Sequence, residues 1–309
     1  MLTPTETACL DAFRAGSDAA HGPAAHDEDG WVAFGLRLLL DAGRMVRSVR
    51  GALGPADVSI KNDGSAVTTV DTAIEEMFRE RLAAFDPRAG VVGEEGGGSL
   101  PASGVGVAID PVDGTWALVN DTETCATTLA IFRDGEPSLG MVSNPATGEI
   151  AYAPVPGAAR LLQLSLFGED DRADVLPRPR LDGGGPLVSV HPSRRAGPLV
   201  AALYRAWRDD EVSLVRAPGG SPAWALAEAA KGSFVYVNLW SRAPAAAYDL
   251  VAGTLVVRGA GGDVTDLEGS PIDAVRHAGP FVAGTDAASR RVVAGRCREA
   301  LEGGGTDQA

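Results

Sequence analysis

The chain has 309 residues, 45% of them hydrophobic, so it is long enough for one large domain or two ordinary ones with a substantial core. Its 27 basic and 41 acidic side chains give a net charge of −14, which argues against a nucleic acid polymer or an anionic membrane as a partner. No apolar run reaches the roughly 18 to 20 residues that cross a bilayer, and the first thirty residues lack the pattern of a signal peptide. We therefore expect a folded cytoplasmic protein.

The first part of the chain predicts a mixed α+β region. Residues 1–30 form an N-terminal extension that we expect to be partly disordered, apart from a short helix over 5–13. Hydrophobic side chains at three- and four-residue spacing then predict two helices, and β-favouring runs separated by Asp-Gly and Thr-Gly turns predict strands, three of them in an antiparallel meander. The predicted helices cover 31–49 and 71–85, and the predicted strands cover 91–92, 105–109, 127–133, 137–142 and 149–154.

The second part predicts an alternating α/β region. Residues 155–186 are interpreted as irregular because they contain prolines and a run of three glycines, and the boundary between a first domain (31–185) and a second (186–309) is placed there. Alternation of strands and helices beyond it favours an α/β layer. The predicted strands cover 187–191, 212–216, 234–239 and 281–283, and the predicted helices cover 194–207, 222–230, 244–258 and 287–301.

The most informative motif is Asp110-Pro111-Val112-Asp113-Gly114-Thr115, which follows the predicted strand 105–109. Two carboxylates three residues apart on a tight turn can share a hard cation such as Mg²⁺, and Gly114 lets backbone N–H groups come close to a phosphate. Taken alone, the motif also fits a surface turn in which Asp and Gly serve only the turn geometry.

Three other segments supply acidic residues. They are the polar loop 61–71, the turn Gly93-Glu94-Glu95 and the helical run 248–253. Each alone also fits a structural role: a capped helix start, an acidic turn, or a helix with one stray acid. Together with the motif they bring five carboxylates to strand ends or helix starts, where layered α/β proteins assemble their active sites. These candidate residues are Asp71, Glu94, Asp110, Asp113 and Asp249.

In this order the four segments resemble the inositol monophosphatase family, within the wider group of metal-dependent, lithium-sensitive phosphatases that includes fructose-bisphosphatases and 3′-nucleotidases. The resemblance covers about residues 31–301 and implies a five-layered αβαβα sandwich that is commonly dimeric. It also implies that one metal is held by Glu94, Asp110 and the carbonyl of Val112, and a second by Asp110, Asp113 and Asp249.

The resemblance assigns further roles around these ligands. Gly114 and Thr115 would contact the substrate phosphate, and Asp71 with Thr115 would position or deprotonate the attacking water near Glu94. Phosphate monoesters hydrolyse very slowly unaided, and two or three Mg²⁺ ions per site would activate the water and neutralise phosphoryl charge. We expect in-line attack by water without a phosphoenzyme. The chain lacks the Asp-x-Asp-x-Thr nucleophile motif, the Gly-x-x-x-x-Gly-Lys-Ser/Thr loop and any Cys-x-x-Cys pair.

The sequence departs from the family pattern at residues that are expected to contact the substrate. Trp116-Ala117-Leu118 replaces a more polar segment, so we expect a bulkier, more apolar wall beside the phosphate. Arg242 stands near the place of an acidic residue that accepts hydrogen bonds from inositol hydroxyls; it either binds a second anionic group or points to solvent. The loop 219–221 would line the leaving-group side. The candidate substrate contacts are Trp116, Gly220, Ser221, Arg242 and Asp249.

These observations predict a Mg²⁺-dependent phosphomonoesterase for a small polyol or sugar phosphate, with inositol 1-phosphate as the default, acting as a homodimer. The alternative within the same chemistry is a bisphosphate substrate, such as adenosine 3′,5′-bisphosphate or fructose 1,6-bisphosphate, or histidinol phosphate. An alternative from another class is a non-catalytic binding protein of the same fold, which the presence of all five carboxylates disfavours.

Overall fold

The computed structural model describes residues 1–16, 27–62, 64–164, 171–178, 185–191, 197–239 and 245–303. The helices are α1 (Pro4–Arg14), α2 (Glu28–Val49), α3 (Thr69–Phe85), α4 (Thr115–Val119), α5 (Gly197–Arg208), α6 (Pro222–Ala230), α7 (Ala247–Gly259) and α8 (Ala287–Gly303), with a 3-10 helix over Pro55–Asp57. The strands are β1 (Val58–Ile60), β2 (Ala66–Thr68), β3 (Gly90–Gly93), β4 (Gly97–Gly98), β5 (Val105–Asp113), β6 (Ala126–Arg133), β7 (Glu136–Asn144), β8 (Glu149–Pro154), β9 (Arg160–Gln163), β10 (Arg172–Val175), β11 (Leu187–Val190), β12 (Leu214–Arg216), β13 (Val235–Asn238), β14 (Asp263–Thr265) and β15 (Phe281–Gly284).

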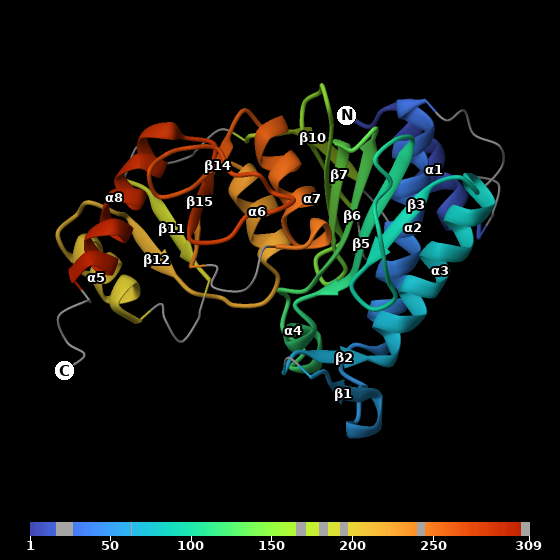
Figure 1. Ribbon diagram of the computed structural model, residues 1–309, viewed down its shortest axis with the longest axis horizontal. Coiled ribbons are helices and arrows are strands. Elements are labelled where there is room, and N and C mark those ends of the chain that lie inside the picture. Colours follow the sequence, from blue (N-terminus) through green and yellow to red (C-terminus); the bar gives the residue numbers. More distant parts are fainter. Residues whose placement is uncertain are drawn as a thin grey trace.

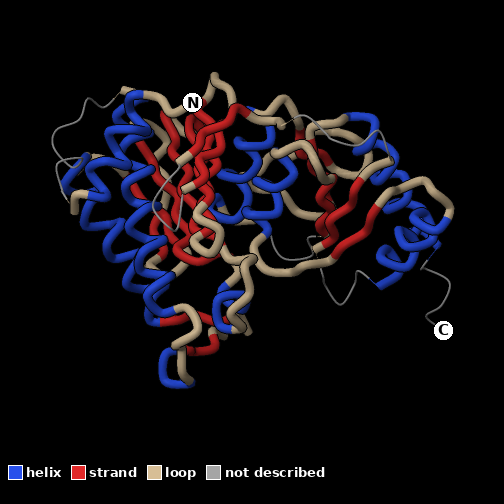
Figure 2. Tube along the Cα trace, turned by 180° about the vertical axis from the view of Figure 1, so that it is seen from behind, coloured by secondary structure: helices blue, strands red, loops and turns tan. Residues whose placement is uncertain are grey.

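Two sheets and three groups of helices form five layers (Figure 1). The eight-stranded sheet has the order β10-β9-β8-β7-β6-β5-β3-β4 and is antiparallel except for the parallel pair β3 and β5. The five-stranded sheet has the order β12-β11-β13-β15-β14. Figure 2 shows α6 and α7 between the two sheets, with α1, α2 and α3 outside the large sheet and α5 and α8 outside the small one. The predicted αβαβα sandwich is therefore confirmed.

The outer helices bury aromatic side chains against the large sheet. The rings of Phe34 in α2 and Phe85 at the end of α3 stack with their centroids 4.4 Å apart. Trp31 meets both rings edge-on, at 5.6 Å and 4.8 Å. Offset and edge-to-face aromatic pairs add to the hydrophobic stabilisation. The spacing that predicted these two helices thus corresponds to their buried faces.

Several predicted bounds differ from the structure. The meander is confirmed as β6, β7 and β8. The interpretation of 155–186 as irregular is wrong where the structure describes it, because β9 and β10 extend the large sheet there. These strands have only four residues each and lie at the edge of the sheet, so they show no periodicity in the sequence. The small strands β1, β2, β4 and β14 were also not predicted.

The first sixteen residues are ordered around a buried ion pair, whereas part of the predicted tail, 17–26, lies outside the described residues. Glu6 in α1 is fully buried and accepts hydrogen bonds from Tyr152 Oη and from Nε and Nη2 of Arg160, each 2.7 Å long. A buried carboxylate needs such partners, since an isolated charge is costly in the interior. Helix α1 is therefore fastened to β8 and β9, and α2 already begins at Glu28.

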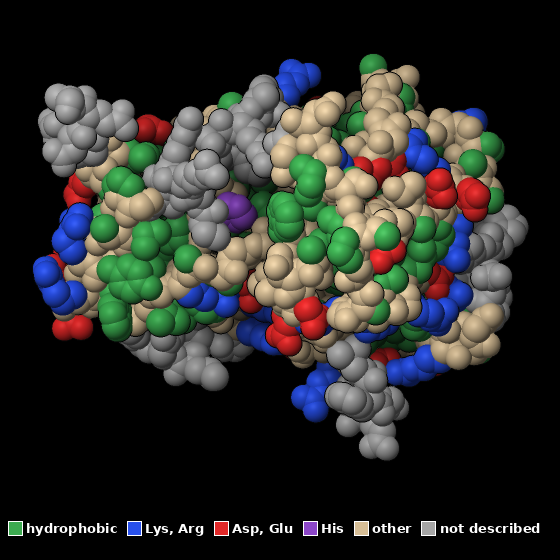
Figure 3. Space-filling model, turned by 90° about the horizontal axis from the view of Figure 1, so that it is seen from below, with side chains coloured by type: hydrophobic (Ala, Val, Ile, Leu, Met, Phe, Trp, Pro, Cys, Tyr) green, Lys and Arg blue, Asp and Glu red, His purple; other side chains and the backbone are tan. Residues whose placement is uncertain are grey.

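The face of the molecule seen from below shows no basic patch among the described residues (Figure 3). In the view from below, described acidic and basic side chains are intermingled, and hydrophobic side chains gather at the end of the molecule formed by the small sheet and its outer helices (Figure 3). Tyr204 and Trp207 of α5 and Leu214 of β12 are among the exposed large hydrophobic residues. Within the described residues, no helix is both long and apolar enough to cross a membrane.

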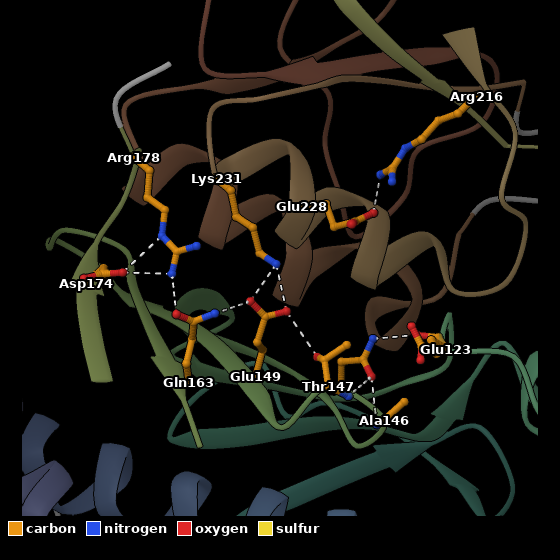
Figure 4. Close-up of polar contacts among 11 residues, drawn as sticks. Glu123, Ala146, Thr147, Glu149, Gln163, Asp174, Arg178, Arg216, Glu228 and Lys231 are labelled. Atoms are coloured by element: carbon orange, nitrogen blue, oxygen red, sulfur yellow. Dashed lines mark hydrogen bonds and ion pairs between the residues drawn. The ribbon is translucent and has the colours of Figure 1, made fainter. Parts of the chain in front are cut away.

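A polar network joins the end of α6 to the large sheet (Figure 4). Nζ of Lys231, which follows α6, lies 2.9 Å from both carboxylate oxygens of Glu149 at the start of β8. Gln163 and Thr147 also donate to Glu149, each at 3.1 Å. Both side chains of the ion pair are largely buried, with exposed fractions of 17% for Lys231 and 10% for Glu149. This network holds the C-terminal end of α6 in place.

We expect Lys231→Met to lower the free energy of unfolding by about 2 kcal/mol, because it leaves the largely buried Glu149 carboxylate without its cation. Urea unfolding would measure the change. The double variant Lys231→Met, Glu149→Gln should lose less than the sum of the two single variants, since it removes both charges. Additive losses would contradict a direct interaction between the two side chains.

Candidate active site

A bulge in β5 directs the side chains of Asp110 and Asp113 to the same face of the sheet. Asp110 pairs with Thr128 of β6 and Asp113 with Ala126, so three steps along β5 match two along β6. Side chains three residues apart in a regular strand point to opposite faces, and one extra residue reverses that alternation. The predicted strand 105–109 therefore continues through the motif to Asp113.

Glu94 is placed beside Asp110 by the parallel pairing of β3 with β5. Gly93 pairs with Ile109, and the backbone N–H of Glu94 donates to the carbonyl of Ile109 at 3.2 Å. The Glu94 carboxylate accepts a hydrogen bond from Nζ of Lys61 at 2.9 Å, and the same ammonium lies 2.8 Å from Glu95. Lys61 lies in the turn between β1 and β2 and was not among the predicted site residues.

Asp71 and Thr115 form a buried hydrogen-bonded pair. Oγ1 of Thr115 lies 3.2 Å from Oδ1 of Asp71 and 3.1 Å from the carbonyl oxygen of Val112, so it can donate to either. The other oxygen of Asp71 accepts the backbone N–H of Thr68 at 3.0 Å and also the Thr68 hydroxyl. Asp71 thus caps the start of α3 and holds the Thr115 hydroxyl at the same time.

Asp113 is held by the start of α6. Its Oδ2 accepts hydrogen bonds from the hydroxyl of Ser221 and from the backbone N–H of Ala223, the latter at 2.8 Å. Ser221 is 2% exposed, and its Oγ also accepts the N–H of Trp224 at 2.8 Å as the helix cap. The Ser221 hydroxyl, predicted to contact substrate, is therefore directed to Asp113 in this structure.

Asp249 enters from the first turn of α7, which packs on the large sheet (Figure 1). Its Oδ2 accepts the backbone N–H of Ala246 at 2.6 Å, so it caps its own helix. The carbonyl of its neighbour Tyr248 accepts a hydrogen bond at 3.1 Å from Oγ1 of Thr128, the residue of β6 that pairs with Asp110. The charge of Asp249 also contributes to the raised pKa values of Asp110 and Asp113. All four sequence segments therefore converge at one end of β5.

Burial and mutual repulsion raise the pKa values of these acids. Burial, followed by the charges of Glu94, Asp113 and Asp249, raises the pKa of Asp110 well above its usual range. Burial raises the pKa of Asp113 to about 7, although its hydrogen bonds to Ser221 and Ala223 act in the opposite direction. Burial also raises the pKa of Asp71. Crowded carboxylates of this kind are typical of sites that bind a cation.

The donor set fits a hard metal ion. Asp110 is 3% exposed, and its Oδ1 accepts no hydrogen bond from any residue that the structure describes. The neighbouring Glu94 carboxyl contributes to the raised pKa of Asp110, and a bound cation would stabilise both carboxylates. Within the described residues, no three acidic, His or Cys side chains are already gathered as closely as metal ligands are.

Gly114 is required where the motif turns into α4. It has φ of +83°, in the left-handed region that favours glycine. A Cβ atom at this position would lie 2.7 Å from the backbone nitrogen of Ser221, which real contacts do not allow. Gly220 is equally restricted, because a Cβ there would lie 2.2 Å from Oγ1 of Thr124. The two glycines let the motif and the loop before α6 approach each other closely.

The expected apolar wall after Thr115 is limited to one side chain. Trp116 is 51% exposed, whereas Ala117 and Leu118 are buried in the core. Only the indole is therefore available to a bound molecule. Arg242 lies outside the described residues, so its two interpretations stay open.

Comparison with known proteins gives consistent matches. The sequence model described as the Inositol monophosphatase family matches residues 27–305. The histidinol-phosphatase of Mycobacterium tuberculosis is 32% identical over 253 residues, which are 79% of this chain and 89% of that protein. The inositol-1-monophosphatase of Rhizobium meliloti is 32% identical over 244 residues, 77% of this chain and 87% of the relative. In fold, the solved Thermotoga maritima IMPase matches with a TM-score of 0.71 at 24% identity, covering 88% of this chain and 98% of that one.

Proposed function

The chain belongs to the inositol monophosphatase family, a family of metal-dependent phosphatases, and we propose that it is a Mg²⁺-dependent phosphomonoesterase for a small alcohol phosphate. As a phosphatase of this family it is an enzyme, which sets aside the alternative of a non-catalytic binding protein. The observation that carries the Mg²⁺ proposal is the buried Oδ1 of Asp110, which accepts no hydrogen bond from the described residues and faces other carboxylates. Such an oxygen is a ligand that Mg²⁺ prefers.

In the proposed site, Glu94, Asp110, Asp113, Asp249 and the carbonyl of Val112 hold two or three Mg²⁺ ions. When bound, these ions supply positive charge to the phosphoryl group and lower the pKa of a water molecule. Because the proposed ligands belong to β5, to the turn after β3 and to α7, these three elements must all be in place for the site to form.

The residues around these ligands orient the reactants. The Thr115 hydroxyl donates to Asp71, which leaves its lone pairs free to accept a hydrogen bond from the attacking water. Asp71, whose pKa is raised by burial, is suited to take up a proton as the water attacks. The backbone N–H groups at Gly114 and Thr115 are proposed to receive the phosphate. Attack is then in line with the leaving alcohol.

The leaving alcohol is proposed to lie beside Trp116, Gly220 and Asp249. Inositol 1-phosphate is the first candidate substrate, since the default within the family is a polyol phosphate. Histidinol phosphate is the second. It is favoured by the Mycobacterium tuberculosis relative and by the exposed indole of Trp116, a flat surface on which an imidazole ring can stack. A bisphosphate is the third, and it depends on Arg242 binding a second anionic group.

A substrate panel with Mg²⁺ would test the proposal. We expect turnover of at least one of inositol 1-phosphate, histidinol phosphate, adenosine 3′,5′-bisphosphate and fructose 1,6-bisphosphate, with kcat/KM for the preferred compound at least about tenfold above the others. Chelation of metal should abolish the activity, and millimolar Li⁺ should inhibit it. Failure to hydrolyse any phosphate monoester would refute the proposed function. In the same proposal the enzyme is a cytoplasmic homodimer.

A further inference from the structure

A buried acid on α3 holds the turn that carries Glu94. Glu75 is 2% exposed, and it lies one helical turn after Asp71. Its Oε2 accepts the backbone N–H of Glu95 at 2.8 Å, and its Oε1 accepts that of Gly96 at 2.9 Å. Both oxygens of one side chain are thus directed to the backbone that immediately follows Glu94.

The two glycines around Glu94 make this contact sterically possible. A Cβ atom on Gly93 would lie 2.3 Å from Oε1 of Glu75, and one on Gly96 would lie 2.6 Å from the same oxygen. Both distances are shorter than real contacts, so a Cβ at either position would push the turn and the Glu75 carboxylate apart. The sequence Gly93-Glu94-Glu95-Gly96 therefore matches the carboxylate beneath it.

Arg79, one turn further along α3, neutralises the buried charge. Its Nε and Nη2 lie 2.9 Å and 2.6 Å from Oε1 of Glu75, and Nη2 also donates to the carbonyl of Gly97 at 2.7 Å. Hydrogen bonds to charged groups are stronger than neutral ones, and a buried pair of this kind holds its geometry well. Helix α3 therefore fastens the backbone of residues 95–97 at three points.

We propose that Glu75 is a positioning residue that fixes the direction of the Glu94 carboxylate and thereby sets how tightly the site binds a divalent cation. The N–H of Glu94 is held by Ile109 of β5 and the N–H of the next residue, Glu95, by Glu75, so the Glu94 side chain leaves a turn with little freedom. Since α3 also carries Asp71, one helix sets the relative positions of Asp71 and Glu94. The inference rests on the proposed function, because it assumes that Glu94 is a metal ligand.

The variant Glu75→Gln tests this role in the full-length protein. Whichever way the amide is turned, its NH₂ group faces a backbone donor, so one hydrogen bond to the turn is lost. We expect calorimetric titration of the chelator-treated protein with Mg²⁺ to show affinity weaker by about ten- to a hundredfold, the range seen when a residue supporting a metal ligand is removed. In activity assays the Mg²⁺ concentration for half-maximal rate should rise, whereas kcat at saturating Mg²⁺ should change by less than about threefold. Glu76→Gln is the matched control, since Glu76 is the adjacent, exposed acid of the same helix.

Two further measurements separate positioning from a general loss of folding. Gly96→Ala leaves every carboxylate unchanged but displaces the turn from Glu75, and it should weaken Mg²⁺ binding in the same direction. In Glu75→Gln, amide hydrogen exchange should quicken at Glu95 and Gly96 while the core strands stay protected. If the unaltered chain binds Mg²⁺ and both variants bind it equally tightly, the inference about Glu75 is wrong and the proposed function is unaffected. Absence of Mg²⁺ binding by the unaltered chain would overturn the proposed function as well.

Discussion

Replacing Asp110 with asparagine is expected to lower turnover by about a thousandfold or more and, at the same time, to raise the melting temperature of the metal-free protein. The loss of turnover follows from the proposed role of Asp110 as a ligand of two metal ions. The gain in stability follows from its burial, because Asn carries no charge to repel its neighbours. An Asn side chain can also donate a hydrogen bond to Glu94.

Three measurements check this pair of effects. They are kcat/KM with saturating Mg²⁺, Mg²⁺ binding by calorimetry, and thermal unfolding in the presence of a chelator. Asp11→Asn is the control, since Asp11 is an exposed residue of α1 far from the acidic cluster in the sequence, and it should change none of the three. Near-normal turnover of Asp110→Asn would refute the assignment of Asp110 as a metal ligand. A lower melting temperature in chelator would show that the acids do not repel one another in the folded protein.

The sequence was sufficient for the helices and the central strands because these elements are long enough to show a period, whereas the five-layered arrangement was implied by the resemblance to the family. Trp31, Phe34 and Leu38 repeat at helical spacing and all lie in the core. Strands β9 and β10 have four residues each, and such short elements at a sheet edge owe their pairing to neighbours that are distant in the sequence. The bulge in β5 could not be predicted from the sequence either, because no single residue type specifies a bulge.

The five acids could be proposed from the sequence because each stands where a strand ends or a helix begins. Their partners could not, because those contacts depend on tertiary packing. Ser221 is 108 residues from Asp113 and Lys61 is 33 from Glu94. The role of Glu75 is indicated only weakly by the sequence. Glu75 follows Asp71 by four residues, and the turn that it contacts has glycine on both sides. That combination is detectable only when the helix and the turn are considered together.

The metal-free protein is expected to lose stability as the pH rises from about 4 to about 7. Asp113 has a pKa of about 7 in the folded protein against 3.8 for an ordinary aspartate, and burial and neighbouring charge raise that of Asp110 as well. Between those values the folded protein binds more protons than the unfolded chain, so raising the pH favours unfolding. Glu6 and Asp41 act in the opposite direction, since ion pairs outweigh the burial that would raise their pKa values. Their effect falls below about pH 4.5, at the acidic edge of this window.

Urea unfolding at about pH 5 and about pH 8, with chelator and with millimolar Mg²⁺, would test this dependence. With chelator, the free energy of unfolding should be lower at the higher pH. Added Mg²⁺ should restore it most at the higher pH, because ions bind the deprotonated carboxylates of the folded state and stabilise it by mass action. Asp113→Asn should make the chelated protein less sensitive to pH, whereas Asp11→Asn should not. A chelated protein that is more stable at pH 8 than at pH 5 would mean that the acids at the end of β5 are already neutralised by other groups, and the metal assignment would lose its electrostatic basis.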